Sequence, residues 1–300
     1  MAKELPVIQP GQRGAGATPI FDKIGIVGLG LIGGSIALKA RELWPSALVI
    51  AVDNKDVLET AMRLHAIDVA AEDLIVLAEA DIVILAAPVK QNIAILDALD
   101  DNVRVPAVIT DTGSTKREIA AAARGLAPRF TFVGGHPLAG AATGGLEHAR
   151  PDLFAGRPWL LSSASDAAGD ALEKLSAFVR ALGAEPRLIA ADAHDRMLAY
   201  LSHLPQLTAS ALMQVVGDGV GEEALSLSGR GLADTTRLAA SPADIWADIA
   251  ATNADQIGPA LDALIALLQD LRRDLPAGDR LTEVFADANR YRLLLRGHGH

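Results

Sequence analysis

The glycine-rich segment Gly28–Gly33 has the spacing of a dinucleotide-binding turn. It has the pattern GxGxxG and lies between an apolar run, Lys23–Val27, and a helical pattern that begins at Leu31. The first glycine of such a turn permits a tight bend, the second lets the backbone approach a pyrophosphate, and the third lets helix and strand pack closely. The helix end adds positive partial charge. The predicted cofactor contacts in this turn are Gly28, Gly30, Leu31, Ile32 and Gly33.

Asp53 ends the next apolar run, about 20 residues past the last glycine, where dinucleotide-binding chains carry an acidic residue. A carboxylate there accepts hydrogen bonds from ribose hydroxyls and repels a 2′-phosphate, which favours NAD over NADP. Lys55 follows two residues later and could weaken that preference, so NADP stays possible. We expect Ala87 and Pro88, after a further run, to form a wall beside the cofactor; the alternative is an ordinary strand-ending turn.

Two later segments carry side chains suited to act on a substrate. Ser114 lies in Asp111–Lys116 and His136 lies in Gly134–Gly140, and each segment follows an apolar run. Ligands of open α/β sheets bind beyond the carboxyl ends of the strands. A histidine whose ordinary pKa is near 6.5 can accept a proton at neutral pH, so His136 is the candidate base. The alternatives are a turn-capping histidine at His136 and a helix N-cap at Ser114.

Short apolar runs that alternate with helical patterns must position these side chains. They lie at residues 23–27, 47–52, 82–87, 107–110, 130–133, 159–162 and 186–190. Continuous runs of this length are typical of parallel strands buried on both faces. After residue 191 the pattern is helical, at 193–216, 221–227, 243–251, 255–274 and 281–295. The predicted class is α/β: an N-terminal Rossmann doubly wound, mostly parallel sheet followed by an all-α C-terminal dimerisation domain.

The same patterns divide the chain into three parts. We expect a flexible Pro/Gly-rich tail over residues 1–20, a dinucleotide-binding domain over 21–191 and a helical substrate and dimerisation domain over 192–300. The pattern of Ile257–Leu271 has an apolar face wider than its own domain needs. Such helices often complete their core across a dimer interface, which predicts a homodimer.

The composition narrows the classes of function. The net charge is −10 and half of the residues are hydrophobic, and an acidic surface disfavours nucleic acid and anionic membranes as partners. No stretch of 18 apolar residues occurs, and the amino end lacks the apolar core of a signal peptide. There is no cysteine and no HExxH or HxxxH spacing, so no metal site is expected. A cytoplasmic protein that acts on a small molecule is the expectation.

Five segments in order resemble the prephenate/arogenate (cyclohexadienyl) dehydrogenase family of tyrosine biosynthesis. They are GIVGLGLIGGS (25–35), DTGSTK (111–116), GGHPLAG (134–140), HDRMLAYLSHLPQ (194–206) and GLADTTRLAASPADIW (231–246). The resemblance implies NAD-dependent oxidation of a cyclohexadienol. Hydride leaves C4 of the ring, the hydroxyl proton passes to His136, and CO2 departs as the ring becomes aromatic. It also implies that Ser114 hydrogen-bonds the hydroxyl or His136 and helps to place the nicotinamide.

The resemblance assigns substrate contacts in the helical part. Arg237 matches the arginine that grips a substrate carboxylate, mainly for binding and orientation. The alternative is an i,i+3 ion pair with Asp234, and both roles can hold if Asp234 orients the arginine. His203 matches a family histidine. His194 lies nine residues earlier, about 900° around a helix, so a straight helix would point the two histidines in opposite directions. Trp246 also matches the pattern, with a core aromatic as the stronger alternative.

Two departures from the family pattern bear on the substrate. Gln206 stands where many prephenate-using members have a histidine, and Ala142 stands where they have an acidic residue. These changes favour arogenate, or acceptance of both substrates. Two other functions stay open: a β-hydroxyacid dehydrogenase, disfavoured because residues 193–216 contain no lysine, and a non-catalytic NAD-binding sensor, disfavoured by the set Ser114, His136 and Arg237.

Overall fold

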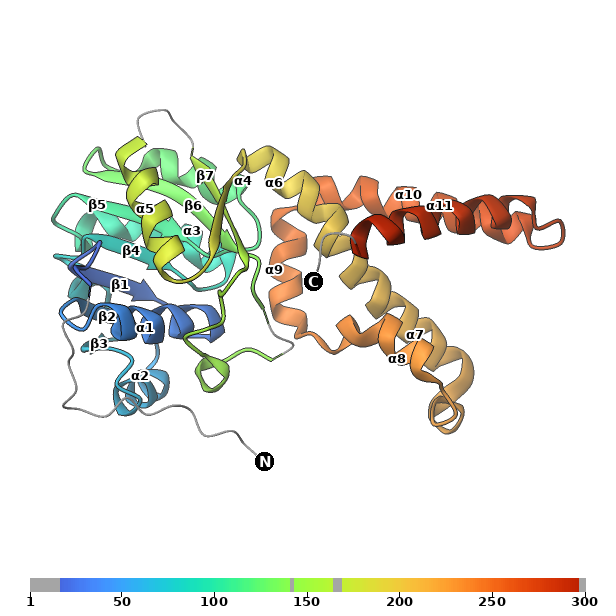
Figure 1. Ribbon diagram of the computed structural model, residues 1–300, viewed down its shortest axis with the longest axis horizontal. Helices are drawn as coiled ribbons and strands as arrows, with labels where there is room; N and C mark the ends of the chain where they lie inside the picture. The colour runs from blue at the N-terminus through green and yellow to red at the C-terminus, as the bar shows by residue number, and fades with distance from the viewer. Residues whose placement is uncertain (1–16, 141–142, 164–168, 297–300) are drawn as a thin grey trace.

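The computed structural model describes residues 17–140, 143–163 and 169–296 (Figure 1). An α/β part holds the strands, and a helical part follows it and extends away from the sheet as two arms. The expectations for most of the tail over 1–20 and for Ala142 lie outside the described residues.

One eight-stranded sheet forms the centre of the α/β part. Its order is β3-β2-β1-β4-β5-β6-β7-β8. All neighbouring pairs are parallel except β6 and β7, so the expected mostly parallel sheet is confirmed. The strands are β1 Lys23–Val27, β2 Leu48–Val52, β3 Val69–Ala71, β4 Ile82–Leu85, β5 Ala107–Asp111, β6 Phe130–Pro137, β7 Pro158–Ser163 and β8 Glu185–Leu188.

Two strands differ from the sequence expectation. β3 has three residues at the sheet edge, too short to leave a periodic signal. β6 continues to Pro137 instead of ending at Val133, because antiparallel pairing with β7 joins His136 to Leu160. His136 therefore stands inside a strand and not on the turn after it, and the ladder restrains its backbone.

Helices cover both faces of the sheet, as Figure 1 shows. One hydrophobic cluster joins α1 and α5 to one face, with Trp44 stacked on Phe178 at 5.2 Å between ring centroids. A second cluster joins α3 and α4 to the other face. The helices are α1 Leu31–Leu43, α2 Lys55–Arg63, α3 Val89–Asn102, α4 Arg117–Ala122 and α5 Gly169–Ala181, with short 3-10 turns η1 Leu74–Leu77, η2 Ala123–Gly125 and η3 Leu146–His148. The doubly wound arrangement is thus confirmed.

The helical part begins next to the sheet and then divides into two arms. Its elements are α6 Ala191–Leu198, the π-helical turn η5 Ala199–His203, α7 Leu204–Leu225, α8 Arg230–Thr236, the 3-10 turn η6 Arg237–Ala240, α9 Ala243–Thr252, α10 Ala254–Asp274 and α11 Asp279–Arg296. α7 with α8 forms one arm, α10 with α11 forms the other, and α9 packs against α3 of the α/β part (Figure 1). Over the described residues, no helix has the length and apolar character to span a membrane.

Candidate active site

A cleft of about 670 Å³ lies between the α/β part and the helical part. Its walls come from the glycine-rich turn, the segments after β4 and β5, the end of β6, α6 with η5, and α9. The predicted residues that line it are Gly30, Leu31, Ile32, Ala87, Pro88, Ser114 and His136, and Trp246 lines the opposite side. The cleft therefore joins the expected cofactor turn to the expected base.

The glycine-rich turn has the shape that a bound dinucleotide needs. Gly28 has φ +94°, and a Cβ there would lie 2.8 Å from the Ala86 carbonyl carbon. A Cβ on Gly33 would lie 1.9 Å from the Gly28 oxygen, so both glycines are required for packing. A Cβ on Gly30 would meet nothing within 4 Å, and α1 has no side-chain N-cap. The open space at Gly30 and the free helix end fit a pyrophosphate.

Asp53 supports this turn directly. Its Oδ2 accepts the Leu29 backbone N–H at 2.6 Å, and its Oδ1 accepts the Asn54 backbone N–H at 2.7 Å. The carboxylate thus ties the end of β2 to the glycine-rich turn, where ribose hydroxyls would meet it. The structure adds this positioning role to the one expected from the sequence.

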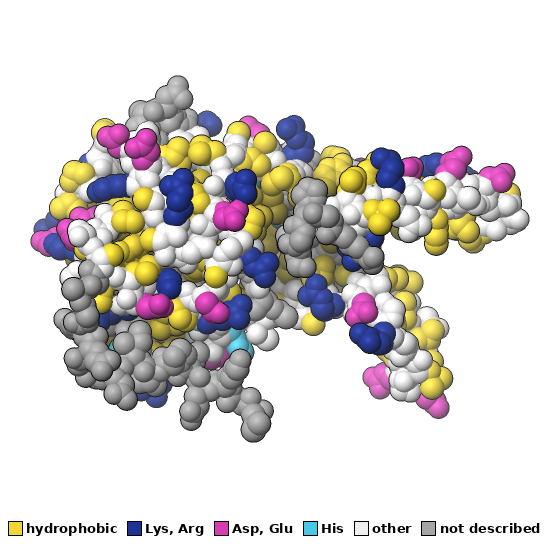
Figure 2. Space-filling view, in the orientation of Figure 1, with side chains coloured by type: hydrophobic (Ala, Val, Ile, Leu, Met, Phe, Trp, Pro, Cys, Tyr) yellow, Lys and Arg dark blue, Asp and Glu magenta, His cyan; other side chains and the backbone are white. Residues whose placement is uncertain are grey.

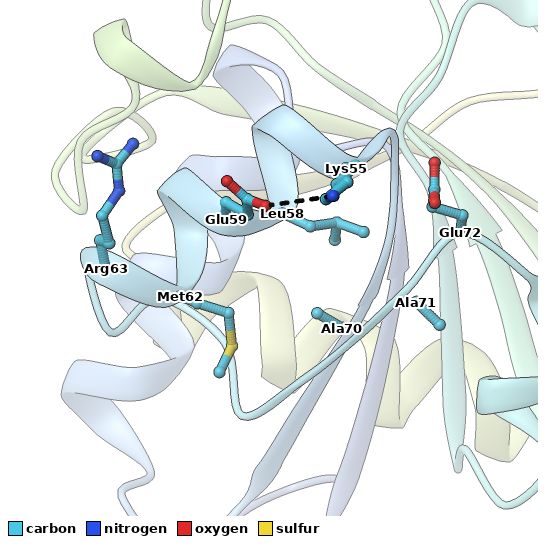
Figure 3. A pocket seen from close by; sticks show the side chains of 8 residues that line it. All are labelled: Lys55, Leu58, Glu59, Met62, Arg63, Ala70, Ala71 and Glu72. Carbon is cyan, nitrogen blue, oxygen red and sulfur yellow. Dashed lines mark ion pairs between the residues drawn. The ribbon is translucent and has the colours of Figure 1, made fainter.

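Lys55 lines a separate surface cavity of about 640 Å³ between α2 and β3. Figure 3 shows it beside Glu59, with 3.9 Å between their charged atoms. The cavity shares no lining residue with the cleft.

His136 presents its ring to the cleft and makes one contact behind it. Its Nδ1 lies 2.9 Å from Nε2 of His194, and Nδ1 of His194 lies 2.8 Å from Oδ1 of Asp195. Burial lowers the pKa of His136 well below its ordinary value, and the neighbouring His194 and Lys116 add to this. His136 is therefore neutral at neutral pH and able to accept a proton.

A buried ion pair lies beneath the strand ends. Lys116 Nζ contacts Asp111, and both side chains are buried. The Asp111 carboxylate also accepts the backbone N–H groups of Gly113 at 2.8 Å and Gly135 at 3.1 Å. Burial lowers the pKa of Lys116, although Asp111 opposes that shift. The pair joins the segment carrying Ser114 to the strand carrying His136.

Ser114 is half-buried in the cleft wall, and no hydrogen bond links its hydroxyl to another described residue. α4 begins at Arg117 with Lys116 at the N-cap position, so the alternative role of Ser114 as the N-cap does not apply. Ser114 therefore lies where the sequence places it, in the wall of the cleft.

His194 and His203 do not lie on one straight α-helix. The π-helical turn η5 lies between them and changes the angular advance along the helix, so the straight-helix count of 900° does not apply. Asn253 Nδ2 donates to the Asp195 carbonyl at 2.9 Å and lies 3.2 Å from His203 Nδ1, so one amide contacts both α6 and the last residue of the π-turn.

His203 is buried behind the cleft wall. Its ring meets Trp246 edge to face at 6.0 Å between centroids, and its Nε2 has no partner among the described residues. Burial lowers the pKa of His203 to about 4. His203 therefore supports Trp246 and carries no charge at neutral pH.

The other predicted substrate contacts do not line the cleft of a single chain. Gln206 is buried: its Nε2 donates to the Leu238 carbonyl at 2.7 Å, and its Oε1 accepts from Ser241 Oγ at 3.2 Å. Arg237 and Asp234 are exposed, and among the described ion pairs none joins them. Ser241 lines the cleft, so Arg237 at the start of η6 lies four residues before the cleft wall.

Sequence reasoning missed part of this site. Asp111 and Lys116 were visible only as members of DTGSTK, and the pair His194-Asp195 only as the start of HDRMLAYLSHLPQ. No motif or spacing in the sequence singled out Asn253. The available clue was that charged residues stand within segments predicted to be buried. Buried charges are normally paired, so partners for Asp111 and Asp195 could have been sought.

Comparisons with known proteins cover almost the whole chain. The family model described as the nucleotide-binding domain of prephenate dehydrogenase matches residues 36–188, and the one described as its dimerization domain matches residues 190–287. Cyclohexadienyl dehydrogenase of Zymomonas mobilis is 32% identical, with 92% of this chain and 97% of the relative covered. Prephenate dehydrogenase of Bacillus subtilis is 32% identical, with 90% and 75% covered.

Two solved structures of dehydrogenases superpose on almost the whole chain. Prephenate dehydrogenase of Aquifex aeolicus, in complex with hydroxyphenyl propionate and NAD+, superposes with a TM-score of 0.84 at 26% identity, covering 91% of this chain and 98% of that one. Arogenate dehydrogenase of Synechocystis has a TM-score of 0.73 at 29% identity, covering 90% and 99%.

Proposed function

The chain belongs to the prephenate dehydrogenase family, and from this membership and its cleft we propose that it catalyses the NAD-dependent oxidative decarboxylation of prephenate, of arogenate, or of both. The products are 4-hydroxyphenylpyruvate from prephenate and tyrosine from arogenate. The observation that carries the proposal is the single cleft, which holds the glycine-rich turn, Ser114 and His136 together.

The glycine-rich turn with Gly30 and Leu31 would hold NAD+, which would supply the acceptor for the hydride from C4 of the substrate ring. His136 takes the proton of the C4 hydroxyl. CO2 then leaves, its bonding electrons complete the aromatic ring, and the C4 oxygen takes the proton back to form the phenol. Ser114 donates to or accepts from the same hydroxyl and holds it near His136. The apolar wall from Pro88, Leu198 and Trp246 excludes water from the reacting carbon.

Arg237 is proposed to bind a substrate carboxylate. Support comes from its position, because η6 leads directly into Ser241 and Pro242 of the cleft wall. Gln206 holds that turn through Leu238 and Ser241 and so positions Arg237, with Asp234 on the adjoining α8. We place the role of Arg237 in binding and orientation, since a contact that stabilised the leaving carboxylate would favour the ground state.

Substrate preference is proposed to lean toward arogenate or toward both substrates. The amide of Gln206 is neutral and already bonded within the protein, so it supplies no positive charge for a pyruvyl carboxylate. His203, the predicted contact behind Trp246, is also neutral at neutral pH.

We propose that the protein works as a homodimer. The dimerization-domain match and the exposed apolar side chains of both arms support this. The cytoplasmic location that the composition favours stays a prediction, as does the preference for NAD over NADP, which is based on Asp53.

The test is formation of NADH or NADPH, followed at 340 nm, with each substrate and each cofactor. Turnover of either substrate with NAD is expected, and the ratio of the two kcat/KM values gives the preference. Folded protein that binds NAD but oxidises neither substrate would refute the proposal.

A further inference from the structure

Three groups from two distant segments form a hydrogen-bonded line behind the cleft. His136 on β6 contacts His194 on α6, 58 positions later, through Nδ1 and Nε2 at 2.9 Å. His194 contacts Asp195 through Nδ1 and Oδ1 at 2.8 Å. His194 and Asp195 are both fully buried, and neither lines the cleft. Only His136 reaches the space where a substrate would lie.

The charge state of Asp195 follows from its other contacts. Its Oδ1 also accepts the Lys116 backbone N–H at 2.7 Å, and its Oδ2 accepts the backbone N–H of Arg117 at 2.9 Å and its Nε at 3.2 Å. The pKa of Asp195 is lowered: burial opposes ionisation, but the bonds from His194, Arg117 and Lys116 outweigh it. Asp195 is a carboxylate, which only accepts hydrogen bonds.

The proton positions then follow in turn along the line. Because Asp195 only accepts, His194 must donate from Nδ1. Burial lowers the pKa of His194, so its ring is neutral and its Nε2 carries a lone pair. Nδ1 of His136 must therefore donate to that lone pair. The bare nitrogen of His136 is Nε2, the one not held by the protein.

We propose that Asp195 and His194 are positioning residues that fix His136 in the tautomer protonated on Nδ1, so that its Nε2 faces the cleft as the base. This rests on the proposed function for the identity of the reaction. An isolated neutral histidine prefers its proton on Nε2, which would leave no base in the cleft. The hydrogen bond made by the other nitrogen decides the tautomer.

The same line accommodates the proton that His136 holds during the reaction. When the substrate hydroxyl gives its proton to Nε2, His136 becomes an imidazolium that still donates from Nδ1 to His194. The charge then lies two hydrogen bonds from the Asp195 carboxylate, which stabilises it, while the charge of Lys116 opposes it. When CO2 leaves, the electrons of the broken bond complete the aromatic ring and reach the C4 oxygen, which takes the proton back from Nε2, so the protein returns to its starting state.

The direct test is nitrogen NMR of the full-length protein labelled with 15N-histidine, at pH 8, with and without NAD. The resonances of His136 are assigned by their loss in His136→Asn. We expect the shift of a protonated nitrogen at Nδ1 and of a bare nitrogen at Nε2. A wild-type spectrum with the proton on Nε2 would overturn the proposal, whatever the variants do.

Two variants of His194 separate tautomer control from simple packing. His194→Phe keeps a ring and removes both nitrogens, so we expect the His136 proton to move to Nε2 and kcat to fall about 10²-fold, with NAD affinity unchanged. His194→Gln can offer its amide oxygen to Nδ1, so it should keep the wild-type tautomer and lose less activity. His148→Phe, at an exposed site outside the cleft, is the matched control.

A His194→Phe protein with wild-type tautomer and kcat would show that the line is only structural and would overturn the proposal. If that variant does not fold, the wild-type and His194→Gln spectra decide the tautomer. The NMR result does not depend on turnover. A failure of the proposed reaction is therefore distinguishable from a failure of the tautomer assignment.

Discussion

The ability of His136 to act as a base depends on its pKa, which burial lowers well below that of a free imidazole. Burial disfavours its charged form, and the positive charge of Lys116 adds to this, so the neutral base dominates at neutral pH. The cost is a lower intrinsic basicity. The three histidines of the site, His136, His194 and His203, are all neutral at neutral pH for the same reason.

Replacing the base tests its role directly. His136→Asn should lower kcat by about 10²–10⁴-fold, because general base catalysis is lost while the cofactor turn is untouched. Steady-state kinetics and titration with NAD are the measurements. The exposed His148→Asn serves as control and should behave as wild type. An unchanged kcat in His136→Asn would exclude His136 as the base.

Arg237 is tested by charge removal. Arg237→Gln should mainly raise KM for the cyclohexadienyl substrate, because a guanidinium that binds and orients a carboxylate contributes to the ground state and the transition state alike. Arg230→Gln, on the same helical segment and also exposed, is the matched control. If KM is equal in both variants and in the wild type, Arg237 does not bind the substrate.

The lowered pKa of His203 should make the free energy of unfolding decrease in acid. Its pKa is about 4 in the folded protein against 6.5 for an ordinary histidine, so below pH 6.5 the unfolded chain gains a proton that the folded one does not. Stability should therefore fall as the pH drops from 6.5 toward 4, with His203 contributing about 2 kcal/mol between pH 7 and pH 5. Urea unfolding at one protein concentration measures this. His203→Phe should show a drop smaller by that amount, and an equal drop would contradict the assignment.

At the scale of the elements, the ends of β1, β2 and β6 are held by polar contacts from elsewhere in the chain. Asp53 holds the turn after β1, and Asp111 holds Gly135 within β6. Arg117 at the start of α4 reaches Asp195 of α6, Asn253 and Asp255. The pKa of Asp255 falls to about 2, chiefly through its bond to Arg117. These contacts connect the sheet to the helical part directly behind the cleft.

Two glycines of the turn should respond differently to the same substitution. Gly30→Ala places a methyl in open space, so stability should hold while NAD affinity falls about tenfold or more, since the methyl occupies the space for the pyrophosphate. Gly33→Ala places a methyl against the Gly28 oxygen and should destabilise the fold by about 2 kcal/mol or more. Thermal unfolding with and without NAD distinguishes them. Equal NAD affinity in Gly30→Ala and wild type would show that the pyrophosphate does not occupy the space beside Gly30.

At the scale of the whole molecule, the two arms leave large apolar side chains uncovered, as Figure 2 shows along both. The exposed residues on α7, α10 and α11 include Leu212, Val215, Ile265, Leu268, Phe285, Tyr291 and Leu293. An isolated chain would not keep so much apolar surface on projecting helices. A second copy of the chain, with its arms packed against the two arms of the first, would bury this apolar surface.

Association is expected to depend on this surface. Phe285→Asp should shift the protein from dimer to monomer, because a charge buried in an apolar interface is strongly unfavourable. Analytical ultracentrifugation over a range of concentrations is the measurement. Met62→Asp places the same charge on an exposed apolar residue of the α/β part and should leave the dimer intact. A dimeric Phe285→Asp would place the interface elsewhere.

The sequence by itself determined the alternation of strands and helices, the glycine-rich turn with Asp53, and the candidacy of Ser114 and His136, because those signals are local: periodicity, turn chemistry and spacing of a few residues. Only the tertiary structure decided that β6 extends through His136, that one Asn253 amide contacts both Asp195 and His203, and that Gln206 is bonded within the protein. These depend on contacts between groups tens of residues apart. The line from His136 to Asp195 is the clearest case, since hydrogen bonds across 58 positions leave no periodic trace in either segment and exist only when sheet and helix are packed together.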